Sequence, residues 1–81
     1  MDTKVKCNDV VDGFMPAEKI ARIQTADGRI ENVAVSVQSI SGDKLLASEI
    51  GREEGKVLVE LPRESASGRW RIWVKESSIG V

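Results

Sequence analysis

The sequence predicts a small all-β domain of five to six antiparallel strands, and three observations support this fold class. Turn signals recur at short, fairly regular intervals along residues 17–81. Several of the segments between these turns alternate apolar and polar residues, which is the pattern of a half-buried strand. The inward positions of these segments are mainly β-branched or aromatic residues, which favour strands. A chain of 81 residues is long enough for a single domain with a small hydrophobic core.

Residues 1–16 are predicted to form a loosely held N-terminal arm. This segment contains an Asp-Gly pair and a Met-Pro pair, and its apolar residues follow no sustained period. A short strand around Val10 and Val11 is the only regular element expected there. The β-domain is therefore assigned to residues 17–81.

The first hairpin is predicted over residues 19–37, where an Asp-Gly pair separates two apolar segments. Ile20 and Ile23 cannot share one face of a regular strand, so we expect a bulge or strong coiling in this hairpin. A helix started by the preceding proline is the alternative for residues 17–25. Residues 44–50 also fit helical spacing, but their shortness and the flanking glycines favour a strand.

Three segments show the clearest alternation, and their inward side chains are expected to build the core. These inward positions are Val33, Val35 and Val37, then Val57, Val59 and Leu61, then Trp70, Ile72 and Val74.

The last two of these segments are predicted to form a hairpin, and facing inward positions set its register. The predicted pairs are Leu61 with Trp70, Val59 with Ile72, Val57 with Val74, Glu60 with Arg71, Leu58 with Trp73, and Lys56 with Lys75. The pair of lysines is unfavourable, so a register shifted by two residues stays open as an alternative. In either register Trp73 faces away from the core.

Residues 73–79, WVKESSI, resemble the end of an SH3-like small barrel. In that superfold a strand commonly ends in a Trp-Val or similar pair, one helical turn follows, and a short last strand closes the barrel. The resemblance implies a turn at Ser77 and Ser78 and a closing strand over residues 79–81. It implies a fold and no function. True SH3 domains read proline-rich peptides with several aromatic residues, and this chain has two Trp, one Phe and no Tyr.

In length and C-terminal layout the chain also resembles the plasmid-borne type II dihydrofolate reductases, which are short SH3-like chains that form tetramers around one shared pore. The Val-Gln-Ile-Tyr motif of their active surface aligns with residues 70–73, which read Trp-Arg-Ile-Trp. Because the Gln and the Tyr are both replaced, the resemblance supports an oligomer more than it supports reductase activity.

The composition excludes several kinds of chemistry. The chain has no His and one Cys, so neither Ser-His-Asp nor Cys-His catalytic sites can form within it, and neither can zinc or copper sites of imidazole and thiolate. Twelve Lys and Arg against 13 Asp and Glu give a net charge of -1, which provides no overall attraction to nucleic acid or anionic lipid. We therefore expect no metal, no cofactor and no catalytic residue.

The expected location is the cytoplasm, and no membrane association is expected. No apolar run reaches the length of a transmembrane helix, and no apolar segment of a signal peptide follows the first residues.

Leu58 and Trp73 are predicted to be outward neighbours on the last hairpin. An aliphatic and an aromatic side chain together on the surface favour contact with a protein. The favoured function is therefore a small non-enzymatic interaction module that binds a protein partner or itself, as a homo-oligomer. The alternative structural role is that the N-terminal arm folds back over this pair.

Arg69, Arg71, Trp73 and Lys75 form the second candidate site, a cationic strip around one aromatic ring. Such a strip could bind single-stranded nucleic acid or a nucleotide by stacking and by phosphate contacts. The competing interpretation is an ordinary solvated strand face whose arginines pair with nearby acids. An enzyme whose site is shared between subunits is the third hypothesis.

Overall fold

The computed structural model describes residues 1–80, so the last residue of the predicted closing strand, Val81, lies outside the described residues. This part of the chain confirms the all-β class, because strands and two single-turn 3-10 helices are its only regular elements. They are β1 (Asp2–Lys6), β2 (Asp9–Asp12), β3 (Glu18–Gln24), β4 (Ile30–Ser36), η1 (Val37–Ser39), β5 (Ile40–Ser41), β6 (Lys44–Glu53), β7 (Lys56–Glu60), β8 (Arg71–Lys75), η2 (Glu76–Ser78) and β9 (Ile79–Gly80).

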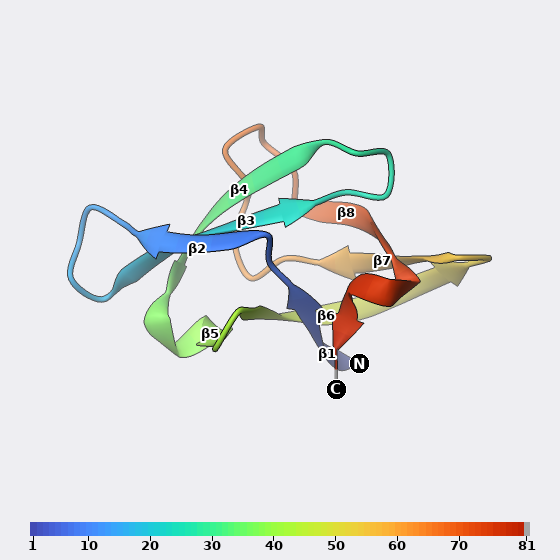
Figure 1. The fold of residues 1–81 in the computed structure, drawn as a ribbon, viewed down its shortest axis with the longest axis horizontal. Coiled ribbons are helices and arrows are strands. Elements are labelled where there is room, and N and C mark those ends of the chain that lie inside the picture. Colours follow the sequence, from blue (N-terminus) through green and yellow to red (C-terminus); the bar gives the residue numbers. More distant parts are fainter. Residues whose placement is uncertain (81) are drawn as a thin grey trace.

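The strands form two antiparallel sheets that lie one over the other (Figure 1). The larger sheet has the order β8-β7-β6-β1-β9, with β5 also paired to β6, and the smaller sheet has the order β2-β3-β4. Within residues 1–80 no pairing joins β8 to β9, so the predicted closed barrel is not found. The described strands β2, β3 and β4 pair only with one another, so the larger sheet keeps two edges, β8 and the two-residue β9, which pairs only with β1.

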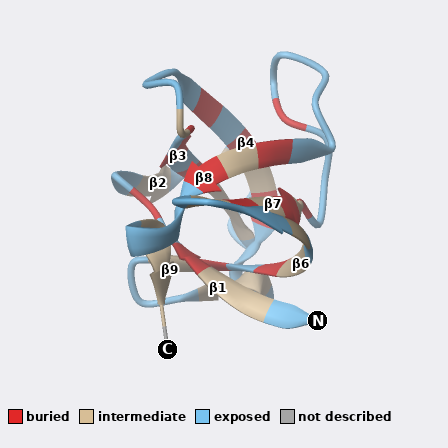
Figure 2. Ribbon diagram, turned by 90° about the vertical axis from the view of Figure 1, so that its right-hand side faces the viewer, coloured by how far each residue is buried: buried red, intermediate tan, exposed pale blue. Residues whose placement is uncertain are grey.

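The hydrophobic core lies between the two sheets, and buried segments of both face it (Figure 2). The largest side chains with essentially no exposed surface come from both sheets: Val5, Ile23, Val33, Val35, Leu45, Val57, Val59 and Val74. Because most of these residues are β-branched, the core is built from the residue types that favour strands.

Two of the residues predicted to face the core, Val37 and Trp70, are exposed instead. Val37 is 38% exposed because the chain leaves β4 at Ser36, whose side chain accepts the Gln38 N–H and starts the η1 turn. Trp70 is 53% exposed because it precedes β8, at the end of the hairpin, where it lines an open groove beside Leu46. The other seven predicted inward residues are buried.

The N-terminal segment is not a loosely held arm. β1 lies between β6 and β9, where Val5 is opposite both Leu45 and Ile79, and its side chain is fully buried. β2, which contains the predicted strand at Val10 and Val11, pairs with β3 at the edge of the smaller sheet. The partners of β1 lie about 40 and 75 positions further along the chain. No local pattern in the sequence could therefore indicate this pairing.

The first hairpin contains no bulge, so the bulge, one of the two expected distortions, is wrong, and so is the alternative helix over 17–25. β3 and β4 pair without a register shift. Ile23 faces the core, whereas Ile20 lies on the outward face between Val11 and Ala34, which are all half-buried. Apolar neighbours on that face remove the need for both isoleucines to point inward. The register shift lies instead in β6, between Glu49 and Gly51.

The predicted register of the last hairpin is confirmed at every pair, including Leu58 with Trp73 and Lys56 with Lys75. The unfavourable lysine pair is tolerated because Lys56 Nζ lies 5.0 Å from the centre of the Trp73 ring and 3.4 Å from a Glu53 oxygen. The helical turn implied by the resemblance is present as η2.

Among residues 1–80, no helix has the length and apolar character that a membrane crossing requires.

Candidate functional site: a cationic cleft beside Trp73

Two turns of similar sequence frame the candidate site: residues 25–29, TADGR, and residues 65–69, SASGR. In each turn the backbone N–H of the first residue donates to the backbone carbonyl of the arginine that ends the turn, at 2.8 Å. The hydroxyl oxygen of the first residue accepts a hydrogen bond from the backbone N–H of that arginine, at 3.0 Å in the first turn and 3.1 Å in the second. Gly28 and Gly68 have φ values of 88° and 86°, a conformation that glycine adopts without strain. The two turns therefore have the same hydrogen-bonded structure.

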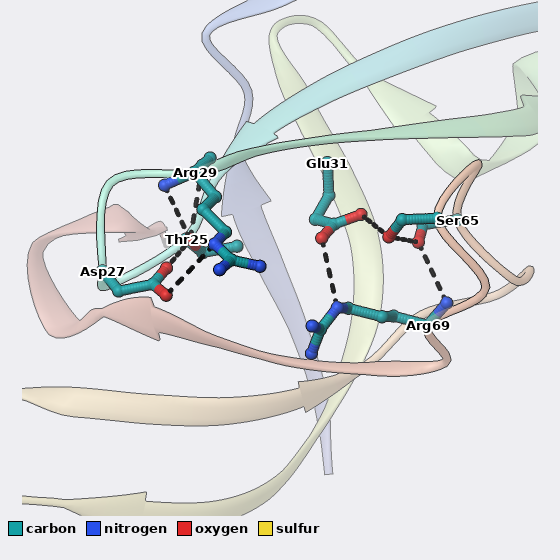
Figure 3. A network of polar contacts seen from close by, with 7 residues as sticks. Thr25, Asp27, Arg29, Glu31, Ser65 and Arg69 are labelled. Atoms are coloured by element: carbon teal, nitrogen blue, oxygen red, sulfur yellow. Dashed lines mark hydrogen bonds and ion pairs between the residues drawn. The ribbon is translucent and has the colours of Figure 1, made fainter.

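Each turn is fixed to a strand of the other hairpin. The Ala26 N–H donates to the Trp73 carbonyl in β8 at 2.8 Å, and the Ala66 N–H donates to the Asn32 carbonyl in β4 at 2.8 Å. Because β8 and β4 are edge strands of the two sheets, each turn covers part of an edge that would otherwise be open. In the close-up of Figure 3 the side chains of Arg29 and Arg69, the arginines that end the two turns, extend into the space between the turns.

A cavity of about 350 Å³ lies at this place, a volume within the range of small-molecule sites. Four cationic side chains, two acidic side chains and one indole contribute to its lining. The lining residues are Thr25, Ala26, Asp27, Arg29, Glu31, Lys56, Arg69, Arg71, Ile72 and Trp73. Among the lining residues the positive side chains outnumber the negative ones, and two further acids just outside the lining, Glu53 and Glu60, pair with Lys56 and Arg71.

The four cations of the cleft each have an acidic neighbour at moderate distance. The ion pairs are Arg29 with Asp27 at 3.7 Å, Arg69 with Glu31 at 3.5 Å, Arg71 with Glu60 at 3.2 Å, and Lys56 with Glu53 at 3.4 Å. The cationic side chains are between 42% and 68% exposed. Arg29, Lys56 and Arg71 pair with solvent-exposed acids, and such pairs contribute little energy, so an incoming anion can compete for these three cations.

The acid at the inner side of the cleft, Glu31, is held by the second turn. Its side chain is 6% exposed; one oxygen accepts a hydrogen bond from the Ser67 hydroxyl at 2.6 Å, and the other faces Arg69 (Figure 3). In the first turn the Thr25 hydroxyl donates to Asp27, and this hydrogen bond lowers the pKa of the Asp27 carboxyl. Asp27 is therefore ionised at neutral pH.

Three of the five predicted site residues come together in the cleft: Arg69, Arg71 and Trp73. Lys75 is exposed at the end of β8, and Leu58 is half-buried beside Trp73. Neither lines the cavity.

The N-terminal arm does not cover Trp73, which was the alternative role for that segment. Phe14 is 96% exposed and Met15 is 65% exposed, Val10 and Val11 pair with β3, and none of these residues lines the cavity beside Trp73. The segment beside Trp73 is the turn at residues 25–29, which is hydrogen-bonded to it.

Sequence reasoning missed Arg29, Glu31 and Lys56 as site residues. Arg29 could have been found from the repeated pattern of Ser or Thr, Ala, any residue, Gly and Arg, which occurs at 25–29 and again at 65–69. Lys56 reaches the cleft from β7, the hairpin partner of β8, and its predicted pairing with Lys75 already placed it near Trp73. Glu31 reaches the cleft from the other sheet, and the sequence carries no comparable signal for it.

The single cysteine has no part in this site. Cys7 is 4% exposed, and burial, with a smaller contribution from Asp43, raises its pKa to about 11. The thiol is therefore protonated and unreactive at neutral pH.

The chain matches no family model, no curated protein and no solved structure in comparisons with known proteins.

Proposed function

We propose that the chain is a small binding module whose cleft binds nucleotide units, either as free nucleotides or within a single strand of nucleic acid. The observation that carries the proposal is the convergence of four cations and the Trp73 indole on one cavity of about 350 Å³. Phosphate and an aromatic base are the two ligand parts that such a combination recognises.

The arginines supply the phosphate contacts in this proposal. A guanidinium group offers planar paired donors that match phosphate oxygens, and its charge is retained at every accessible pH. Arg71 and Arg29 are paired with exposed acids, so binding phosphate costs only the loss of weak ion pairs.

Trp73 supplies the stacking surface. Its ring is contacted by Lys56, whose Nζ lies 5.0 Å from the ring centre. A base that stacks on this side of the ring displaces Lys56, which then approaches the phosphate. Stacking tolerates every base, so this contact contributes affinity without sequence preference.

The test uses Trp73 fluorescence in a Trp70→Phe background, since the chain has two tryptophans. Titration with guanosine and adenosine monophosphates and with a ten-nucleotide single strand of mixed sequence is expected to quench Trp73. Arg71→Glu should weaken binding at least tenfold, because one charge-assisted contact is lost and a repulsive charge is added. Arg63→Glu, which makes the same charge change in an exposed loop outside the cleft, should leave binding unchanged.

Salt distinguishes the two sources of the nucleotide. If the ligand is a single strand, log affinity falls with log salt concentration by about 0.7 for each phosphate contacted. A free nucleotide should then bind more weakly than the strand. Absence of quenching by every probe, or equal loss of binding in both arginine variants, contradicts the proposal.

A second candidate function, self-association, is favoured by one groove on another part of the surface. Trp70 and Leu46 are 53% and 39% exposed, and both line an open groove of about 680 Å³ with Leu61 and Pro62. Tryptophan is enriched in protein interfaces, and exposed apolar side chains that lie together favour contact with a protein. We therefore propose the Trp70 groove, in place of the half-buried Leu58 and Trp73 pair, as the surface for association.

Self-association is tested by light scattering on a size-exclusion column over a range of concentrations. The unmodified chain is expected to have the mass of a dimer or larger oligomer. Trp70→Asp should reduce this to the monomer mass, whereas Trp73→Asp should leave the oligomer intact. A monomer at every concentration, or loss of the oligomer only in Trp73→Asp, contradicts the Trp70 groove as the interface.

A further inference from the structure

We infer that the cleft selects guanine over the other bases and that Glu31 makes this selection. The inference rests on the proposed nucleotide binding and adds the identity of the base. It starts from one unusual feature: a carboxylate whose side chain is 6% exposed lines a cavity in which cations predominate.

The Glu31 carboxylate has acceptor capacity that its two protein partners do not fill. Ser67 donates to one oxygen at 2.6 Å, which is a strong hydrogen bond. Arg69 Nε lies 3.5 Å from the other oxygen, an ion pair that is longer than an ordinary hydrogen bond. A carboxylate offers about four lone-pair sites on two oxygens, so each oxygen can accept from one more donor.

Two adjacent donors are what such a carboxylate binds best, and guanine presents them. Its ring N1–H and its exocyclic amino group lie side by side on the Watson–Crick edge, the edge by which pockets read an unpaired base. Adenine and cytosine each present one donor beside one ring acceptor, and uracil presents one donor between two carbonyl oxygens. With any of these three bases, a ring nitrogen or carbonyl acceptor would face the carboxylate charge.

The remaining lining residues suit the same ligand. Trp73 offers an aromatic surface for the purine, and Arg29 and Arg71 lie on the same cavity for the phosphate. Ser67 and Arg69 hold the carboxylate in place from a turn that is itself fixed to β4. A carboxylate fixed in this way does not rotate to suit another base, and this rigidity is the source of the selectivity.

The inference is tested by comparing guanosine, inosine and adenosine monophosphates, with Trp73 fluorescence in the Trp70→Phe background as the readout. Guanosine monophosphate should bind at least tenfold more tightly than adenosine monophosphate, as is typical of a good bidentate contact to a base. Inosine monophosphate, which lacks the exocyclic amino group, should bind with intermediate affinity. This comparison needs no change at Glu31.

Glu31→Gln then assigns the selection to this residue. An amide presents one acceptor and one donor, so the variant should lose the preference for guanine and gain affinity for adenine. Glu54→Gln, which removes the same charge in the exposed β6–β7 turn, should keep the guanine preference. Equal affinities for the guanosine and adenosine nucleotides overturn the inference and leave nucleotide binding intact, and so does a guanine preference that persists in Glu31→Gln. Failure of every nucleotide and of the oligonucleotide to bind overturns both proposals.

Discussion

Replacement of Val5 by aspartate is expected to abolish the cooperative unfolding transition of the chain. Val5 is fully buried in β1, the strand that joins β6 to β9 in the larger sheet. An uncompensated charge at such a position costs several kcal/mol. A domain of 81 residues has a total stability of about 4–12 kcal/mol at ordinary values per residue. The substitution therefore removes much or all of the stability, and thermal and urea unfolding followed by circular dichroism should show it.

The matched control for this prediction is Phe14→Asp, which introduces the same charge in the same N-terminal segment. Phe14 is 96% exposed, so the control should change stability by less than about 0.5 kcal/mol. If Val5→Asp unfolds at the same urea concentration as the unmodified chain, β1 contributes nothing to the folded state. Residues 1–6 would then belong to the loose arm that the local sequence pattern indicates over residues 1–16.

This contrast shows which parts of the fold local sequence reasoning can reach. The last hairpin was predicted pair by pair because its two strands are close in sequence and share one alternation, from Val57 with Val74 to Glu60 with Arg71. β1 was missed because its partners in β6 and β9 are far along the chain. Barrel closure was predicted by analogy alone, and the described strands form two separate sheets with β8 and β9 at the edges of the larger one.

The candidate site divides in the same way. Arg71 and Trp73 were predicted together because they alternate on one strand, and their side chains do share a cavity. Glu31 was missed because it enters the cleft from β4, in the other sheet, and only the docking of the two turns brings it there. Leu58 was predicted beside Trp73 and does lie opposite it, but the strand pairing leaves it half-buried and outside the cavity.

The double substitution Ala26→Pro and Ala66→Pro is expected to loosen the contact between the two hairpins and to lower stability by about 1–3 kcal/mol. Each proline removes one N–H donor, from the bond to the Trp73 carbonyl or from the bond to the Asn32 carbonyl. An intramolecular hydrogen bond contributes about 0.5–1.5 kcal/mol, so two such losses give the stated range. Urea unfolding followed by circular dichroism measures the difference.

The turns themselves should survive these substitutions, and this makes the test specific to docking. Ala26 and Ala66 follow the first residue of their turns, the position at which proline is favoured. The matched control, serine at both positions, keeps the N–H groups and should leave stability within about 0.5 kcal/mol of the unmodified chain. Because Arg29 and Glu31 share the cavity with Trp73 only while the turns are docked, the proline variant should also bind nucleotides more weakly. Unchanged stability in the proline variant would mean that side-chain packing alone joins the two layers and that the repeated turns serve another purpose.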